Sequence, residues 1–347
     1  MIKDQIITEN YAAYNGDCMH VIPTLADESI HLVVYSPPFA GLYNYSSHEN
    51  DFSNCESKEQ FLQQYEFLVS ELSRVTMKGR INAVHVTEVV QNNGQSWDFP
   101  GEVIKMHERN GFDYAGRITV WKEPLKVRMR TMVKSLMHKL IVEDATQCFP
   151  AQPDYILLFR KRGENPVPVE HPFGMFNYAG ATPLLPAHLG TYGLPIADFD
   201  FSSDFGDGLE AYSWASFKAL QRKYRDHQDP KTNKCSHIVW QRYASSVWDD
   251  IRIDNVLPFR DGKDEDDEKH VHPLQLDVID RVVELWSNPG EIVLTPFAGV
   301  GSEGYSPVSL KRKSIMIELK ESYFKQLGLN MKEATTRFKE NVQAELF

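Results

Sequence analysis

The chain has 347 residues, 42% of them hydrophobic and 24% charged, which is the composition of a globular protein with a sizeable core. Its length predicts a catalytic domain with an insertion or a small second lobe. No apolar run is long enough to cross a bilayer, and the first residues show no secretory signal. The four cysteines are scattered without metal-ligand spacing, so we expect reduced thiols, no metal site and a cytoplasmic location.

The charge is unevenly distributed along the chain. The formal net charge of −11 argues mildly against a nucleic-acid partner when it is taken alone. However, residues 117–139 contain seven basic residues and one acidic residue, and residues 218–234 contain six basic and two acidic residues. Such local basic stretches can bind phosphates even in an acidic protein, although they can equally be solvated surfaces.

Short β-branched runs alternate with longer helical patterns outside the middle of the chain. Residues 57–77 and 273–286 place apolar side chains at spacings of three and four, which predicts amphipathic helices. The strand candidates are almost continuously apolar, as strands covered on both faces are. This alternation predicts an α/β fold with a mostly parallel sheet and helices on both sides. In chain order the predicted strands are residues 31–36, 81–86, 116–121, 154–159, 292–295 and 314–318.

The first predicted strand ends in a motif suited to holding an amino group. The sequence VVYSPPF covers the end of this strand and the residues after it, and it contains Ser36, Pro37, Pro38 and Phe39. The prolines fix the backbone and have no N–H, which leaves carbonyl oxygens as acceptors, and the serine adds a hydroxyl. An aromatic ring can stack on a base, so the motif predicts a pocket for a nucleobase flipped out of a helix. The alternative is a strand that is simply ended by two prolines.

Residues 164–247 differ from the rest of the chain. They are rich in proline, glycine, aspartate and aromatic residues, and they contain few strand signals. One helix is predicted there, over residues 212–225. We interpret the segment as an insertion that decorates the α/β core.

A glycine-containing turn follows the predicted strand at residues 292–295. The sequence LTPFAGVGS ends this strand, places Gly299 and Gly301 in the turn and then begins a helix. Glycines allow a tight turn and a close approach of the backbone to a ligand. The next strand ends in Glu318, where an acidic side chain can hold ribose hydroxyls. Because Gly301 is followed by Ser302 and Glu303, and not by the Lys-Ser/Thr pair of a P-loop, the unit predicts a ligand with a ribose but no triphosphate; a purely structural turn is the alternative.

Together these motifs resemble those of the amino-group DNA methyltransferases, which methylate N4 of cytosine or N6 of adenine. SPPF follows an apolar strand and FAGVG lies near the C-terminus, so the catalytic motif precedes the cofactor motif, as in the β arrangement of that family. The resemblance covers about residues 10–163 and 248–335. Further similar segments are NGDCMHVIPTL at 15–25, LVSELSRVTMKGR at 68–80, Trp121–Lys122, DYILLFRK at 154–161 and His272–Pro273.

The resemblance implies the Rossmann-like fold of S-adenosylmethionine-dependent methyltransferases, with a mixed, mostly parallel seven-stranded sheet and helices on both faces. Residues 1–163 would form the catalytic half of the core and residues 248–347 its cofactor-binding half. The insertion at residues 164–247 falls where the family places its target recognition region. The cofactor would be S-adenosylmethionine, bound by Asp17, Cys18, Ser36, His272, Thr295, Pro296, Phe297, Gly299, Gly301 and Glu318.

One residue departs from the pattern of the family. The family usually has aspartate at the end of the cofactor strand, where it contacts the amino group of the methionine moiety, whereas this chain has Thr295. A hydroxyl is a weaker partner for an ammonium group than a carboxylate is. A DNA-binding protein that has lost its cofactor is therefore the alternative to an active enzyme, and the affinity for S-adenosylmethionine would distinguish them.

The resemblance also implies a reaction. Ser36 and the carbonyl group of Pro37 would accept hydrogen bonds from the amino group of the base, and in-line methyl transfer would gain much of its acceleration from positioning. No nucleophilic cysteine is needed, so Cys18 and Cys148 are expected to be packing residues. Serine before PPF is typical of the cytosine-N4 enzymes, so cytosine N4 is the predicted target. Adenine N6 is the alternative, and methylation of RNA or of a protein amide is a more distant one.

The predicted partner is double-stranded DNA, and no membrane partner is expected. A homodimer and a cognate restriction enzyme are further partners that the resemblance allows. We expect the basic stretches to contact phosphates and the aromatic residues of the insertion to assist in reading bases. The residues assigned to DNA are Lys122, Lys126, Arg128, Arg130, Lys134, Arg222, Lys223 and Arg225.

Overall fold

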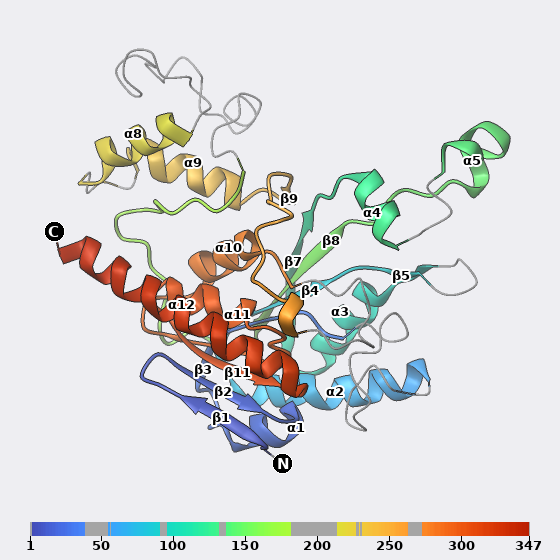
Figure 1. Cartoon of the computed structure of the whole chain (residues 1–347), viewed down its shortest axis with the longest axis horizontal. Helices are drawn as coiled ribbons and strands as arrows, with labels where there is room; N and C mark the ends of the chain where they lie inside the picture. Colours follow the sequence, from blue (N-terminus) through green and yellow to red (C-terminus); the bar gives the residue numbers. More distant parts are fainter. Residues whose placement is uncertain are drawn as a thin grey trace.

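Nine strands form one mixed sheet in the computed structural model, which describes residues 2–38, 55, 57–90, 96–131, 137–181, 214–226, 229, 231–262 and 273–346. Helices cover both faces of this sheet (Figure 1). The strands are β1 (Asp4–Ile7), β2 (Tyr11–Asn15), β3 (Ile30–Tyr35), β4 (Thr76–Val86), β7 (Phe112–Val120), β8 (Asp154–Lys161), β9 (Val247–Trp248), β10 (Ile292–Thr295) and β11 (Lys313–Glu318). Across the sheet their order is β1-β2-β11-β10-β3-β4-β8-β7-β9.

The direction of the strands defines one functional edge of the sheet. Strands β2, β11, β10, β3 and β4 run parallel, whereas β8 runs antiparallel between β4 and β7. The ends of the parallel strands and of β7 therefore meet the beginning of β8 at one edge, which we call the carboxyl edge. Ligands of open α/β sheets bind outside this edge. The topology confirms the predicted Rossmann-like fold, and β1 and β9 extend the predicted seven-stranded sheet at its two sides.

Two hydrophobic cores lie on opposite faces of the sheet, because successive side chains of a strand point to opposite sides. One face is covered by α10 (Leu276–Trp286), α11 (Ser302–Ser309) and α12 (Glu321–Leu346), and the other by α1 (Cys18–Val21), α2 (Lys58–Val75) and α3 (Phe99–Arg109). On β3, Leu32 and Val34 belong to the first core, whereas Val33 and Tyr35 belong to the second. The predicted helices at 57–77 and 273–286 are confirmed as α2 and α10, each slightly shorter than expected.

The described part of residues 164–247 builds a small core of its own. α8 (Trp214–Tyr224) confirms the predicted helix, and α9 (Lys234–Tyr243) packs beside it although the sequence did not predict it. A buried ionic cluster joins this region to the main core, because Asp250 pairs with Arg242 of α9 at 2.9 Å and with Arg281 of α10 at 2.8 Å.

Two further short helices, α4 (Pro124–Thr131) and α5 (His138–Glu143), follow β7, and β5 (Val89–Val90) pairs with β6 (Ser96–Trp97) in a separate small sheet. In Figure 1, α4 and α5 project from the same side of the core as α8 and α9, with β9 between the two pairs. Among the helices that the structure describes, none has the length and apolar composition needed to cross a membrane.

Candidate active site

Ser36 lies beside His85 at the carboxyl edge. β3 pairs with β4 so that Tyr35 is opposite Val84, and this register brings the next residue of each strand together. The Ser36 hydroxyl and Nδ1 of His85 are 2.5 Å apart, which is a short hydrogen bond. One residue earlier, the buried Tyr35 hydroxyl bonds that of Tyr65 on α2 at 2.8 Å. The end of β3 is therefore held by side chains from two different elements.

The other ring nitrogen of His85 is held by Asp154. This residue begins β8, opposite Val120 at the end of β7, and its Oδ2 lies 2.7 Å from Nε2 of His85. The ammonium group of Lys122, two residues beyond β7, bonds the same carboxylate. The side chains of Lys122 and Asp154 are each 8% exposed, and that of His85 is 12% exposed. A continuous line of side chains thus runs from Ser36 through His85 to Asp154 and Lys122.

The charge of Asp154 sets the direction of these hydrogen bonds. Burial alone would raise the pKa of Asp154, but the positive charge of Lys122 and the bond from His85 outweigh burial and lower it, so the carboxylate is ionised at neutral pH. Nε2 of a neutral imidazole then carries the hydrogen that it donates to this carboxylate. Nδ1 keeps a lone pair and accepts the hydroxyl hydrogen of Ser36, whose oxygen can in turn accept from a substrate.

The rest of the SPPF motif continues along the same edge. Pro37 is buried and Pro38 is half-buried directly after Ser36. Phe39 lies outside the described residues, so its stacking role stays a prediction. Because Val33 of β3 pairs with Leu294 of β10, the serine lies one strand away from the turn that follows β10.

The turn after β10 is open to a ligand. Gly299 and Gly301 have φ angles of 52° and 98°, which residues with side chains rarely adopt. A Cβ at Gly299 would meet none of the described atoms within 4 Å, whereas a Cβ at Gly301 would lie 3.0 Å from Cγ of Leu327 in α12. The first glycine therefore leaves space beside the turn that a ligand could occupy, and the second allows the turn to pack closely on α12.

Two acidic side chains lie at the neighbouring strand ends. Glu318 ends β11, and its carboxylate accepts the N–H of Gly299 at 2.7 Å and that of Lys320 at 2.8 Å. Pairing of β11 with β2 places Glu318 opposite Asn15, two residues before Asp17. Asp17 accepts a backbone N–H at the beginning of α1 and caps that helix. The glycine turn and both acids therefore lie together at the ends of β10, β11 and β2.

An unsatisfied hydroxyl and an unpaired carboxyl group accompany this turn. Thr295 ends β10 fully buried, and its hydroxyl has no hydrogen-bond partner within the part of the chain that the structure describes. A buried polar group of this kind costs about 1–3 kcal/mol when it stays unpaired, so Thr295 is a candidate contact for a bound ligand. Glu303, in the first turn of α11, is 5% exposed and forms no ion pair with the described residues. Burial, and after it the charge of Glu318, raises the pKa of Glu303 to about 8.

The other residues predicted to bind the cofactor surround the same turn. Pro296 is buried, and the ring centroid of Phe297 lies 6.0 Å from that of Tyr35. Cys18 is buried, and burial raises the pKa of its thiol, so it acts as a packing residue there. Cys148, predicted to be a packing residue, is only half-buried. His272 lies outside the described residues.

The donor set at this turn fits S-adenosylmethionine. Carboxylates at strand ends suit ribose hydroxyls, and an open glycine backbone suits a ligand that approaches closely. The unsatisfied hydroxyl of Thr295 can accept a hydrogen bond from an ammonium group. Glu318, Asp17, Gly299 and Thr295 are therefore the residues that could hold the cofactor.

The residues predicted to contact DNA fall into two groups. Lys122 lies inside the site with its ammonium group bonded to Asp154, so it is not part of an exposed basic surface. Of the others, Lys126, Arg222, Lys223 and Arg225 are exposed, Arg128 and Arg130 belong to α4 with side chains that are not described, and Lys134 lies outside the described residues.

Sequence reasoning missed His85 and the role of Asp154. Both residues lie in predicted strands, 81–86 and 154–159, and a polar residue near the end of an apolar strand is the signal that could have singled them out. The pairing of β4 with β8, which brings them together, has no signal in the sequence.

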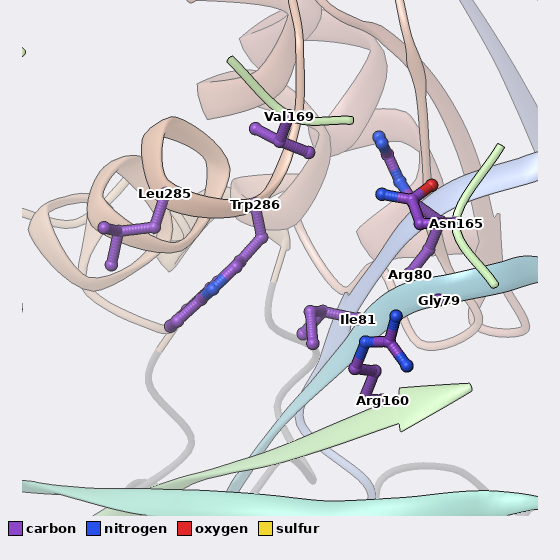
Figure 2. Close-up of a pocket in the computed structure, with 8 residues that line it drawn as sticks. All are labelled: Gly79, Arg80, Ile81, Arg160, Asn165, Val169, Leu285 and Trp286. Atoms are coloured by element: carbon purple, nitrogen blue, oxygen red, sulfur yellow. The ribbon is translucent and has the colours of Figure 1, made fainter. Parts of the chain in front are cut away.

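A separate cavity of about 290 Å³ lies away from the carboxyl edge, with Arg80, Arg160 and Trp286 among its lining residues (Figure 2). These residues come from the first half of β4, the last half of β8 and the end of α10. Arg80 already forms a buried ion pair with Glu291. We therefore place the candidate site at the carboxyl edge.

Comparison with known sequences agrees with this geometry. The profile of an N6/N4 methyltransferase family, described as DNA methylase, matches residues 30–328, so the chain belongs to this family. DNA adenine methyltransferase YhdJ of Escherichia coli (strain K12) is 30% identical over 120 residues. That match spans 34% of this chain and 36% of YhdJ, so the chain matches about a third of the length of this relative.

Solved structures share the fold. TTHA0409 of Thermus thermophilus, provisionally described as a DNA modification methylase, aligns with a TM-score of 0.56 at 18% identity, over 94% of this chain and 96% of that chain. Its complex with S-adenosyl-L-methionine aligns with a TM-score of 0.53 at 18% identity, over 93% and 94%. The cytosine-N4-specific PvuII DNA methyltransferase aligns with a TM-score of 0.55 at 13% identity, over 98% and 95%.

Proposed function

We propose that the protein is a site-specific DNA methyltransferase that moves a methyl group from S-adenosylmethionine to the exocyclic amino group of a flipped base. The observation that carries this proposal is the position of the Ser36 hydroxyl. His85 holds it at the end of β3, one strand from the open glycine turn after β10. Membership of the DNA methylase family and the complex of TTHA0409 with S-adenosyl-L-methionine support the reaction class and the cofactor.

The SPPF motif receives the amino group. Ser36 Oγ and the carbonyl oxygen of Pro37 accept hydrogen bonds from its two N–H groups, which directs the nitrogen lone pair out of conjugation with the ring. Phe39 stacks on the base, a contact worth about 1–3 kcal/mol. Positioning the nitrogen in line with the methyl group supplies much of the acceleration.

The turn after β10 and its acids hold the cofactor. S-adenosylmethionine, when bound, supplies a methyl group on a sulfonium centre that leaves as a neutral thioether. Glu318 binds the ribose hydroxyls, and Asp17 lies beside it at the neighbouring strand end. The Thr295 hydroxyl, unsatisfied among the described residues, accepts from the ammonium group of the methionine moiety.

Double-stranded DNA lies across the side of the molecule from which α4 and α8 project (Figure 1). The exposed cations Lys126, Arg222, Lys223 and Arg225 contact its phosphates, which position the duplex without reading its sequence. Residues 164–247 form the target recognition region between the catalytic half, 1–163, and the cofactor-binding half, 248–347.

We assign cytosine N4 as the target, with adenine N6 as the alternative. The assignment rests on Ser36, a neutral residue before PPF that is compatible with a shallow pyrimidine pocket. The relatives do not separate the two bases, because YhdJ is described as a DNA adenine methyltransferase and the PvuII enzyme as cytosine-N4-specific.

The proposal is tested by expressing the full chain in a host without DNA methylation. Sequencing with modification detection reports the site, and mass spectrometry of digested nucleosides reports the base. We expect N4-methylcytosine within one sequence motif, and none in cells that express Ser36→Ala. N6-methyladenine alone would overturn the cytosine assignment, and unmodified DNA would overturn the activity.

A further inference from the structure

The proposed reaction releases a proton that Ser36 alone cannot keep. As the amino nitrogen bonds the methyl carbon, the methyl–sulfur bond breaks and its electron pair stays on sulfur. The nitrogen becomes positively charged and must lose one of its protons. A serine hydroxyl is a weak base, so a stronger base must lie behind it.

We propose that His85 takes this proton through Ser36. One proton of the methylated amino nitrogen moves to Ser36 Oγ, leaving its bonding electrons on nitrogen, while the hydroxyl hydrogen of Ser36 passes as a proton to Nδ1 of His85, 2.5 Å away. The methylated amine becomes neutral, and His85 becomes an imidazolium that still bonds Asp154 across 2.7 Å. Release of that proton to solvent restores the starting state. The inference rests on the proposed function, and His85 is a positioning residue because it acts through Ser36.

Asp154 and Lys122 complete the arrangement. The carboxylate directs the Nε2 hydrogen of His85 toward itself, which leaves the Nδ1 lone pair facing Ser36 and stabilises the imidazolium when it forms. The ion pair with Lys122 keeps this carboxylate charged, and the side chains of both residues are only 8% exposed. Water screens such a buried pair poorly, so the charges act strongly on the imidazole between Asp154 and Ser36.

The first test is the pH dependence of single-turnover methyl transfer, with the full-length protein in excess over DNA from a methylation-free host and saturating S-adenosylmethionine. The wild-type rate is expected to rise with pH through one ionisation and then level, because an imidazolium cannot accept the hydroxyl hydrogen of Ser36. His85→Asn places an amide without basicity near Nδ1. It should lower the rate by roughly 10²–10⁴-fold and remove the ionisation, with the affinity for S-adenosylmethionine unchanged.

A matched control and a double variant sharpen this test. His31→Asn alters a histidine near the beginning of β3, the strand that ends just before Ser36, and should keep both the rate and its pH profile. Because Ser36 and His85 act as a unit, Ser36→Ala with His85→Asn should be no slower than the slower single variant. Additive losses, or His85→Asn with the wild-type ionisation, would overturn the relay.

A second measurement is independent of activity. Nitrogen-15 NMR of labelled histidine in the full chain without DNA reports the tautomer of His85. We expect hydrogen on Nε2 and a free lone pair on Nδ1, and Asp154→Asn should change this balance. If the wild-type protein methylates no DNA, the proposed function fails. The NMR result tests the relay independently, because hydrogen on Nδ1 in the neutral ring would overturn it.

Discussion

The backbone N–H of Gly299 donates to Oε2 of Glu318 across 2.7 Å, so the turn after β10 is joined directly to the end of β11. The other carboxylate oxygen accepts the N–H of Lys320 at 2.8 Å. Glu318 is therefore fixed by two backbone groups before any ligand arrives. A carboxylate that is held in place loses less conformational entropy on binding, so this arrangement would favour affinity for the ribose that we propose Glu318 binds.

Substituting Gly299 separates ligand binding from stability. Gly299→Leu is expected to abolish binding of S-adenosylmethionine, because the side chain fills the open space above the turn. Gly290 is a matched control, since its φ is also positive, 83°, and its surroundings among the described residues are equally open. Both leucine variants should lose about 1–2 kcal/mol of unfolding free energy from backbone strain. Isothermal titration calorimetry with the cofactor should detect a loss for Gly299→Leu alone; wild-type affinity in this variant would remove the turn from the site.

The sequence alone predicts the glycine turn because all of its parts are close together along the chain. Strand β10, the glycines and strand β11 follow one another within a single stretch of chain, so their residue types alone indicate a strand, a turn, a helix and a strand. The end of β3 is similar, because Ser36 and the two prolines are adjacent in sequence. Both halves of the site were therefore visible as separate motifs.

The contacts between elements had no such signal. Ser36 meets His85 only through the register of β3 with β4, and His85 meets Asp154 only through the pairing of β4 with β8. Lys122 illustrates the consequence: in the sequence it belongs to a basic stretch, whereas in the fold its ammonium group is buried against Asp154. The sequence did not predict the short strands β2 and β9, because they have too few residues or too mixed a composition to indicate a strand. Pairing with neighbouring strands stabilises them in the fold.

Thr295 should affect cofactor binding more than folding. Its hydroxyl has no partner among the described residues, so Thr295→Val removes an unsatisfied polar group and should leave the unfolding free energy unchanged or raise it. If the hydroxyl accepts from the ammonium group of the cofactor, the same change should weaken binding roughly 10- to 100-fold, the equivalent of one hydrogen bond to a charged group. Thermal unfolding and calorimetry measure the two effects. A clear loss of stability with unchanged affinity would show that the hydroxyl has a structural partner.

Glu303 should make stability fall with increasing pH. Its ordinary pKa is 4.5, and burial raises the pKa in the folded protein to about 8. Below about pH 4.5 both folded and unfolded states hold the proton, and the group has no effect. Between about pH 4.5 and pH 8 the carboxyl group ionises in the unfolded state first, which favours unfolding. Above about pH 8 it is ionised in both states, and the full free-energy cost of burying its charge remains.

Glu303→Gln should therefore be more stable than the wild type at pH 9 and equally stable near pH 4. Denaturant unfolding at both pH values measures this difference. Glu59 is an exposed acid in the first turn of α2 and serves as the control. Its charge interacts favourably with the beginning of a helix, so Glu59→Gln should cost a few tenths of a kcal/mol at pH 9, with the opposite sign. Equal behaviour of the two variants would contradict the buried state of Glu303.

Salt dependence tests the proposed DNA surface. Each phosphate neutralised on duplex DNA contributes about −0.9 to the slope of log affinity against log salt concentration. Arg222→Gln with Lys223→Gln, on the exposed side of α8, should therefore make the slope shallower by about 1.8. Lys325→Gln with Lys332→Gln removes the same charge from α12 and should leave the slope unchanged, because that helix packs on the core with α10 and α11 and carries none of the cations assigned to DNA.

Lys122→Gln distinguishes the basic stretch in the sequence from the surface in the fold. Its ammonium group is buried against Asp154, so the variant should keep the wild-type salt slope and lose methyl transfer instead, because His85 no longer faces a charge-stabilised carboxylate. Fluorescence anisotropy of labelled duplex DNA over a salt series measures the slope, and single-turnover assays measure the transfer. A shallower slope for Lys122→Gln together with full activity would show that Lys122 contacts DNA. It would also show that Lys122 has no role in the arrangement of Ser36, His85 and Asp154.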